Sequence, residues 1–292
     1  MCCAIPLALA EPTDRSYFLN LKSNALLEFY LFDNTVNPDD SALNLERGFL
    51  FGDGFFTTGL IVQGDFLHLK LHLKRLADSA HKLGFKSFDL AKLKSRLEPL
   101  CERSTNACIR ITISRRQSQR GYRIPSEEQV TVVIQLSPLP GIPDFDCELL
   151  FASTPISVNS FLAGLKHLNR LDNVLAASEV SEVYQESLLC DGETVICGSR
   201  TNLFIHQAGQ WFTPTLDKAG IHGITRLRLI TALRAANIPI EERNLDKKTV
   251  LNCEAAFVTN SLLGIWPVCK IENKALATDL VEQLQSQLNF VR

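Results

Sequence analysis

Residues 47–62 read RGFLFGDGFFTTGLIV, a run in which glycines interrupt large apolar side chains. Glycine permits the positive φ angles of tight turns, while the flanking Phe, Thr, Ile and Val favour strands. The segment therefore predicts two strands around a tight turn, and Gln63-Gly64-Asp65 predicts a hairpin turn directly after it. Outward from this segment, helical and strand patterns follow one another without strict alternation, which predicts an α+β fold.

Two amphipathic helices are expected next, because apolar residues recur at helical spacing. The first should end near Gly84, since glycine suits the left-handed backbone that follows many helices. Its apolar stripe consists of Leu73, Leu76, Ala77, Ala80 and Leu83. The stripe of the second helix consists of Leu90, Leu93, Leu97 and Leu100.

Two strands should follow these helices. Residues 108–114 place three isoleucines on one side and Arg110, Thr112 and Ser114 on the other, so the polar side could line a cleft. Residues 129–136 are more uniformly apolar, which predicts a more central strand.

A chain of 292 residues suits two modest domains. The stretch SPLPGIPDFD, residues 137–146, is dense in Pro and Gly and predicts a linker, which we place at residues 138–147. We expect an N-terminal extension over 1–28, a smaller α+β domain over 29–137 and a larger α+β domain over 148–292.

The second half mixes strands, helices and hairpins. Asp191-Gly192 and Ala208-Gly209 predict two hairpin turns. Further strands are expected at residues 148–154, 254–259 and 264–269, and helices at 172–185 and 223–237. A last amphipathic helix carries Leu276, Leu280, Leu284 and Leu288.

Composition excludes several classes of function. Apolar residues make up 46% and the net charge is −2, so neither nucleic acid nor a membrane is an expected partner. The nine cysteines include no CxxC pair and none lies at zinc-ligand spacing from a histidine, so no metal site is expected. Reduced thiols in a cytoplasmic protein are the simple interpretation. Residues 1–10 lack the basic start of a secretory signal.

Lys166 is the first candidate for chemistry. It lies in a loop between Leu165 and Leu168, with His167 and Arg170 close in sequence. Apolar surroundings and neighbouring cations lower the pKa of a lysine amine, which makes it a usable nucleophile. The simpler alternative is a solvated loop lysine, because lysine is seldom buried.

Three further features could bind an anion. Residues 223–226 open a helix whose first amides could receive a phosphate, and Asn260-Ser261 enters a turn after a strand. Arg75 lies beside the apolar stripe of its helix. The alternatives are an ordinary helix start, an Asx or Ser turn, and a solvated surface charge.

A cluster of arginines follows the half-polar strand, in the order Arg115-Arg116 and then Arg120-Gly121-Tyr122-Arg123. Such a cluster is most often solvated surface. Because guanidinium groups match carboxylates, Arg110, Arg120 and Tyr122 are candidates for binding an acidic substrate.

Seven separated motifs can be read together. They are RGFLFGDGFFTT, HLKRL, ISR followed by RGY, GLKHLNRLDNVLA, TNLF, GIHGITR and VTNSLLGIWPV. In order and spacing they resemble the class IV pyridoxal-phosphate (PLP) aminotransferases, over about residues 30–270. GLKHLNRL and RGY are more similar to the aminodeoxychorismate lyases of this family than to its branched-chain or D-amino-acid aminotransferases. The resemblance implies the two-domain D-amino-acid-aminotransferase-like fold, PLP in the larger domain and a homodimer.

The resemblance also assigns roles to residues. Lys166 matches the lysine that holds PLP as a Schiff base and moves protons. Arg75 matches the side chain that binds the cofactor phosphate, Ile224 and Thr225 match amides at that phosphate, and Ser261 matches a hydroxyl-bearing residue there. These roles agree with an anion at a helix N-terminus beside a forked guanidinium.

Two positions depart from the family. Cys197 stands where the family usually places a glutamate that contacts the pyridine nitrogen of PLP. Glu193 is close in sequence, but four strand residues span about 13 Å, so it should not substitute. Leu171 stands where some aminotransferases place a tyrosine. Transamination is therefore expected to suffer.

The implied reaction converts 4-amino-4-deoxychorismate, a small molecule, to 4-aminobenzoate and pyruvate, a step toward folate. One alternative is a class IV aminotransferase for D-amino or branched-chain amino acids. Another is a PLP-binding relative without efficient turnover.

Overall fold

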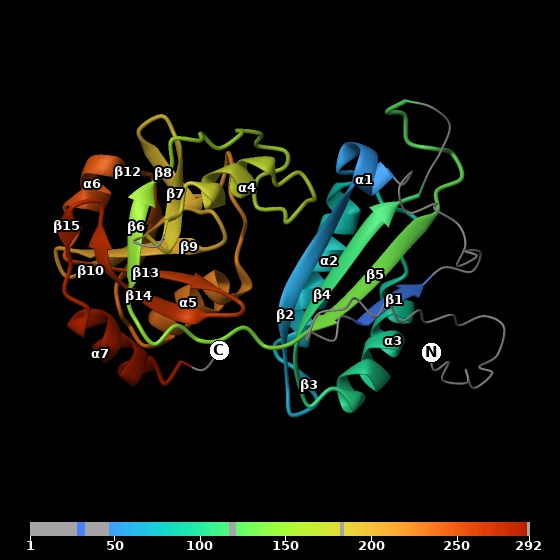
Figure 1. The fold of residues 1–292 in the computed structure, drawn as a ribbon, viewed down its shortest axis with the longest axis horizontal. Coiled ribbons are helices and arrows are strands. Elements are labelled where there is room, and N and C mark those ends of the chain that lie inside the picture. Colours follow the sequence, from blue (N-terminus) through green and yellow to red (C-terminus); the bar gives the residue numbers. More distant parts are fainter. Residues whose placement is uncertain (1–27, 33–46, 117–120, 182–183, 291–292) are drawn as a thin grey trace, which may run out of the picture. The chain divides into compact units, whose positions relative to one another are not determined.

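The computed structural model describes residues 28–32, 47–116, 121–181 and 184–290. Two compact units form within it, each with its own sheet (Figure 1). The first contains the described residues before Leu67 together with Leu76–Leu139, and the second combines Leu67–Arg75 with the chain from Pro140 onward. Helices and mixed sheets occur in both, so the α+β prediction is confirmed.

The sheet of the first unit has five antiparallel strands in the order β1-β5-β4-β2-β3, which Figure 1 shows with β4 between β5 and β2. The strands are β1 (Glu28–Phe32), β2 (Gly54–Val62), β3 (Asp65–Phe66), β4 (Asn106–Arg115) and β5 (Val130–Ser137). The isoleucines of β4 are fully buried and Arg110 is half-buried, as the alternation predicts. The expectation that β5 is more central than β4 is wrong, because β4 is the middle strand and several β5 side chains are half-exposed.

The start of the opening segment is helical, so the prediction of two strands there is wrong. Residues Arg47–Phe51 form the short helix α1, and only β2 is a strand. The side chain of Arg47 is buried and bonds Asp53, Nε to Oδ2, at 2.7 Å, which curls the chain back on itself. The predicted hairpin is confirmed between β2 and β3, where Gln63 and Gly64 have φ of 53° and 86°.

Both predicted helices of this part of the chain are present. They are α2 (Leu69–Lys82) and α3 (Leu90–Arg103). Gly84 follows α2 with φ of 70°, and Asp89 caps α3 by accepting from the Lys92 amide at 2.9 Å. The division into units falls within α2, so Arg75 belongs to the second unit.

The second unit holds a larger mixed sheet in the order β11-β10-β9-β13-β14-β6-β7-β8-β12, with β15 on β14. Its strands are β6 (Cys147–Phe151), β7 (Glu186–Asp191), β8 (Thr194–Gly198), β9 (Asn202–Gln207), β10 (Gln210–Pro214), β11 (Ile240–Arg243), β12 (Leu245–Asp246), β13 (Ala255–Asn260), β14 (Gly264–Ile271) and β15 (Lys274–Ala275). The two predicted hairpin turns are confirmed: one joins β7 to β8, and the other joins β9 to β10.

Helices cover this sheet because its side chains alternate between faces. Phe204 and Phe257 pack toward α5 (Ile224–Ala235) and α7 (Asp279–Leu288). Leu203 and Val258 point into the opposite core, which includes Val250 of α6 (Lys247–Leu251). Asn202 Nδ2, at the start of β9, donates to the Ile221 carbonyl at 3.0 Å, so α5 starts at the end of the sheet where β9 begins.

Two details differ from the sequence predictions. The helix expected at 172–185 is the shorter α4 (Leu171–Ser178), because Gln185 already bonds to Glu148 and leads into β7 beside β6. In α7 the buried residues are Val281 and Leu284, while Leu280 is 38% exposed. No helix of the described residues is long and apolar enough to cross a membrane.

Candidate active site

The segment that carries Lys166 runs beside the start of α5. Gly164 forms a parallel bridge with Ile221, its amide bonds the Gly220 carbonyl at 3.1 Å, and its carbonyl accepts from His222 at 3.1 Å. Lys166 follows two residues later and is half-buried. The Lys166 side chain is thus partly shielded from solvent, and the segment that carries it lies beside the residues that precede α5; its role as the reactive lysine stays a prediction.

Close packing at this bridge requires a glycine. Gly164 has φ of 81°, and a Cβ there would lie 2.0 Å from the His222 ring. Any larger residue would push His222 and the start of α5 away from the lysine segment. The glycine in GLK is thus explained by its contact with a segment more than fifty residues later.

The first turn of α5 can bind an anion. Gly223 is its N-cap and, within the described chain, no side chain caps it, while Ile224 and Thr225 are buried just inside. The first amides of a helix have no partner within the helix and carry the positive end of its dipole. A Cβ on Gly223 would lie 2.0 Å from Asn202 Oδ1, so only glycine lets these segments meet.

Arg75 also lies beside the N-terminus of α5. Its Nη2 donates to the His222 carbonyl at 2.6 Å, one residue before the N-cap of α5. Burial lowers the pKa of Arg75 to about 10, so the guanidinium is desolvated yet charged at neutral pH. The structure therefore brings Arg75, Lys166, Ile224 and Thr225 to one end of the second unit.

Ser261 occupies the same end of the sheet. It follows β13, whose Thr259 pairs with Asn202 at the start of β9. Asn260 accepts from the amides of Leu262 and Leu263 at 2.9 and 2.8 Å, so the Asx turn considered from sequence does form. The turn leaves Ser261 half-buried.

Cys197, at the end of β8, is a buried thiol that keeps its proton. It is 4% exposed within an apolar cluster that includes Leu189. Burial, and then the Glu186 carboxylate, raise its pKa to about 12, while Arg170 and Lys166 act in the opposite direction. The position thus offers a neutral thiol beside cations. The carboxylate of Glu193 is instead 82% exposed, near Lys247.

Arg170 stiffens the chain that follows the lysine. Its Nε donates to the His167 carbonyl at 3.0 Å, its Nη1 to Asn173 Oδ1 at 3.3 Å, and its Nη2 contacts His167 Nε2. Burial and the Arg170 charge lower the pKa of His167 to about 4, so the ring is neutral. His167 Nδ1 is buried without a hydrogen-bond partner among the described residues.

Sequence reasoning missed two buried polar residues near this site. Glu186 is fully buried at the first position of β7, and its signal was a charged residue at the start of a strand whose next residues, SLLC, carry no charge. His72 is 1% exposed, and burial followed by the charges of Arg75, His68 and Lys166 lowers its pKa to about 3. Its signal was a histidine one turn before Arg75.

Two of the predicted substrate-binding residues, Arg110 and Tyr122, belong to the first unit. Arg110 stacks on Phe56, with its guanidinium 3.9 Å from the ring centroid, and bonds Thr112 at 3.3 Å. Tyr122 is 82% exposed and lies 5.0 Å from the Phe51 ring. Arg120 lies outside the described residues, and the role of all three in substrate binding stays a prediction.

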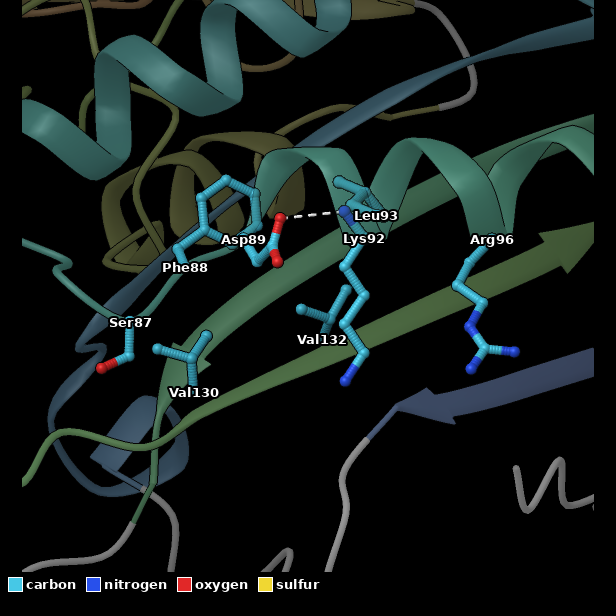
Figure 2. A pocket seen from close by; sticks show the side chains of 8 residues that line it. All are labelled: Ser87, Phe88, Asp89, Lys92, Leu93, Arg96, Val130 and Val132. Atoms are coloured by element: carbon cyan, nitrogen blue, oxygen red, sulfur yellow. Dashed lines mark hydrogen bonds between the residues drawn. The ribbon is translucent and has the colours of Figure 1, made fainter. Parts of the chain in front are cut away.

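A pocket of about 90 Å³ lies in the first unit between the start of α3 and β5 (Figure 2). Its lining includes Lys92 and Arg96 of α3 and Val130 and Val132 of β5, and none of the predicted site residues. Across the described parts of the chain, no group of three His, Cys, Asp or Glu residues is arranged to hold a metal ion.

The chain belongs to the class IV aminotransferases: the model of the family "Amino-transferase class IV" matches residues 54–271. This family uses PLP. An aminodeoxychorismate lyase of Vibrio harveyi is 27% identical over 84% of this chain and 94% of its own. A D-alanine aminotransferase of Bacillus licheniformis is 24% identical over 83% of this chain and 88% of its own.

A solved structure agrees with these sequence relatives. The 4-amino-4-deoxychorismate lyase of Pseudomonas aeruginosa superposes with a TM-score of 0.82 and 28% identity, covering 89% of this chain and 98% of its own. The family resemblance inferred from the seven motifs and the two-domain fold of that family are thereby confirmed.

Proposed function

We propose that this chain is a PLP-dependent lyase that converts 4-amino-4-deoxychorismate to 4-aminobenzoate and pyruvate. The observation that carries the proposal is the meeting of the lysine segment, Arg75 and the start of α5, joined by the Gly164–Ile221 bridge and the Arg75–His222 bond. The two lyase relatives, at 27% and 28% identity, favour this substrate.

The residues fit the phosphate end of PLP. A dianionic phosphate would be stabilised by the α5 amides of Ile224 and Thr225 and by the desolvated Arg75 guanidinium, with Ser261 offering a hydroxyl. Lys166 would hold the cofactor covalently. At the ring nitrogen the fit departs from the usual pattern, because Cys197 offers a neutral thiol in place of a carboxylate.

When bound, PLP would supply an electron sink at the carbon that carries the substrate amine. In our proposal the Lys166 amine takes the proton from that carbon, and the bond to the enolpyruvyl oxygen breaks. The electron pair of the C–H bond completes the aromatic ring, and the enolpyruvyl group leaves with its oxygen to yield pyruvate. The chain contributes positioning and a base, while aromatisation supplies driving force.

Two other functions are tested by the same experiments. A class IV aminotransferase is favoured by the D-alanine aminotransferase relative, and it would need the ring-nitrogen carboxylate that Cys197 replaces. A PLP-binding relative without turnover would bind the cofactor and leave aminodeoxychorismate unchanged.

The test compares the protein with Lys166→Ala and, as a matched control, with Lys248→Ala on the exposed face of α6. We expect the visible absorbance of bound PLP and at least ~10³-fold of lyase turnover to be lost in Lys166→Ala, because nucleophile and base vanish together. Lys248→Ala should keep both. Release of pyruvate from aminodeoxychorismate, measured beside amino-group transfer to 2-oxo acids, separates the lyase from the aminotransferase. Most of the turnover surviving in Lys166→Ala would exclude the assignment.

We also propose that the protein acts as a cytoplasmic homodimer. Leu171, Val174 and Leu175 of α4 are 68%, 61% and 47% exposed. At spacings of three and four they share one face of the helix. A second copy that covers this apolar face would remove it from water, which is favourable.

A further inference from the structure

Residues 198–202, which comprise the turn between β8 and β9 and the strand residue on each side of it, contact several other segments of the second unit, and we call them the hub loop. It exchanges one hydrogen bond with each of three elements that carry or adjoin candidate cofactor residues. Asn173 Nδ2 of α4 donates to the Ser199 carbonyl at 2.7 Å, Asn260 Nδ2 of β13 to the Arg200 carbonyl at 3.4 Å, and Asn202 Nδ2 to the Ile221 carbonyl at 3.0 Å.

Each of these contacts ends near a residue assigned to the cofactor. Asn173 lies on α4, seven residues after Lys166, and Asn260 directly precedes Ser261. Asn202 also packs against Gly223, the N-cap of α5. The hub loop therefore sets where the lysine segment, the serine turn and the phosphate-binding helix lie relative to one another.

One buried carboxylate holds the hub loop in place. Glu186 is 0% exposed, and its carboxylate accepts hydrogen bonds from the hub loop. The donors are the Ser199 amide at 2.9 Å, Ser199 Oγ at 2.5 Å, Thr201 Oγ1 at 3.0 Å and the Arg200 amide at 3.4 Å. The Ser187 amide donates to the same carboxylate at 2.9 Å.

The contact is also close in a steric sense. A Cβ on Gly198 would lie 2.1 Å from Thr201 Oγ1 and 3.0 Å from Glu186 Cδ, so the carboxylate packs directly against the loop backbone. A buried charge is stable only where donors surround it, and here both oxygens have them. If the charge were removed, these donors would lose a strong acceptor and the loop would lose its fixed shape.

We propose that Glu186 is a positioning residue for the cofactor site, which its negative charge organises through the hub loop without contact with the cofactor. The inference rests on the proposed function, because it takes Lys166, Ser261 and α5 as the PLP-binding elements. Its consequence is that PLP affinity depends on a buried carboxylate packed against Gly198, and on the donors of Ser199 and Thr201.

The experiment measures the dissociation constant of PLP by equilibrium dialysis of the full chain, with the visible absorbance of the bound cofactor recorded at each point. Glu186→Gln keeps the size and removes the charge. We expect it to raise the dissociation constant at least tenfold, equal to about 1.4 kcal/mol, and to change the absorbance. The matched control is Glu254→Gln, which removes an exposed carboxylate that bonds the Ala208 amide and His206 at the far end of β9. The control should stay within twofold.

A double-mutant cycle shows whether the charge acts through the hub loop. If it does, Glu186→Gln combined with Thr201→Val raises the dissociation constant by less than the product of the two single effects.

A lower unfolding temperature of the cofactor-free Glu186→Gln protein, with PLP affinity and absorbance unchanged, would overturn the inference. Should Glu186→Gln not fold, Ser199→Ala and Thr201→Val take its place, and unchanged affinity in both overturns it. Absence of PLP binding by the unmodified protein rejects the proposed function as well, whereas normal binding there confines a failure to Glu186.

Discussion

Cys197→Glu tests why this chain should favour elimination over transamination. The rise in the pKa of the Cys197 thiol from an ordinary 9.0 to about 12 means that its surroundings disfavour a negative charge by about 4 kcal/mol. A neutral thiol offers the ring nitrogen at most a weak hydrogen bond, so the cofactor should be a poorer electron sink. An elimination that gains aromaticity depends less on that sink than transamination does. We therefore expect lyase activity with little aminotransferase activity in the unmodified protein.

The introduced carboxyl group should meet the same surroundings. We expect burial and the nearby Glu186 to raise its pKa. In the cofactor-free protein, the loss of folding stability that the new carboxyl group causes should therefore grow as pH rises. A group whose pKa is raised in the folded state contributes stability below its unfolded pKa and loses it as pH rises through the folded pKa. Urea unfolding at pH 5 and pH 8 should show Cys197→Glu less stable than Cys197→Gln by about 2–4 kcal/mol at pH 8, and by less at pH 5.

Bound PLP should offset the stability lost in Cys197→Glu, since a protonated ring nitrogen would pair with the new carboxylate. Cys197→Glu should then gain amino transfer from a simple amino acid and change the visible absorbance, while Cys197→Gln should not. The alternative is that Cys197 is only a small buried apolar residue and that another group reaches the nitrogen. Strong aminotransferase activity in the unmodified protein would refute the reasoning.

Three further predictions address other parts of the chain. Arg110→Gln or Arg120→Gln should raise the KM for aminodeoxychorismate tenfold or more, since a charge-assisted hydrogen bond contributes about 1.5–3 kcal/mol. An unchanged kcat/KM in both variants would show that neither arginine binds the substrate. His72, with its pKa lowered to about 3, should make the protein lose stability as pH falls below 6.5, by up to about 5 kcal/mol near pH 3. In His72→Gln the free energy of unfolding should depend less on pH below 6.5. His81→Gln, at an exposed position of α2, should leave that dependence unchanged. Val174→Glu should shift a dimer toward monomer in sedimentation, and an unchanged mass would exclude α4 from the interface.

Local patterns predicted most secondary structure because their physical causes are local. Alternation in β4 and positive-φ glycines at the hairpins are set by neighbours in sequence, and both are confirmed. The helical start at Arg47 was missed because part of its cause is distant: besides Asp53, the guanidinium bonds the carbonyls of Gly121 and Tyr122 at 3.1 and 2.9 Å. Helix α4 ends early for a similar reason, since Gln185 bonds Glu148 of β6, a strand that lies earlier in the chain.

For the candidate site, the sequence by itself determined which residue types are present and, through seven motifs, the family and the roles expected of Lys166 and Arg75. Only the tertiary structure decided that Gly164 and Gly223 are needed for close packing, and that Glu186 is buried against Gly198 with donors on both oxygens. A motif records residues that are close along the chain, whereas the cost of a buried charge and the fit of a glycine depend on atoms brought together from segments far apart in it.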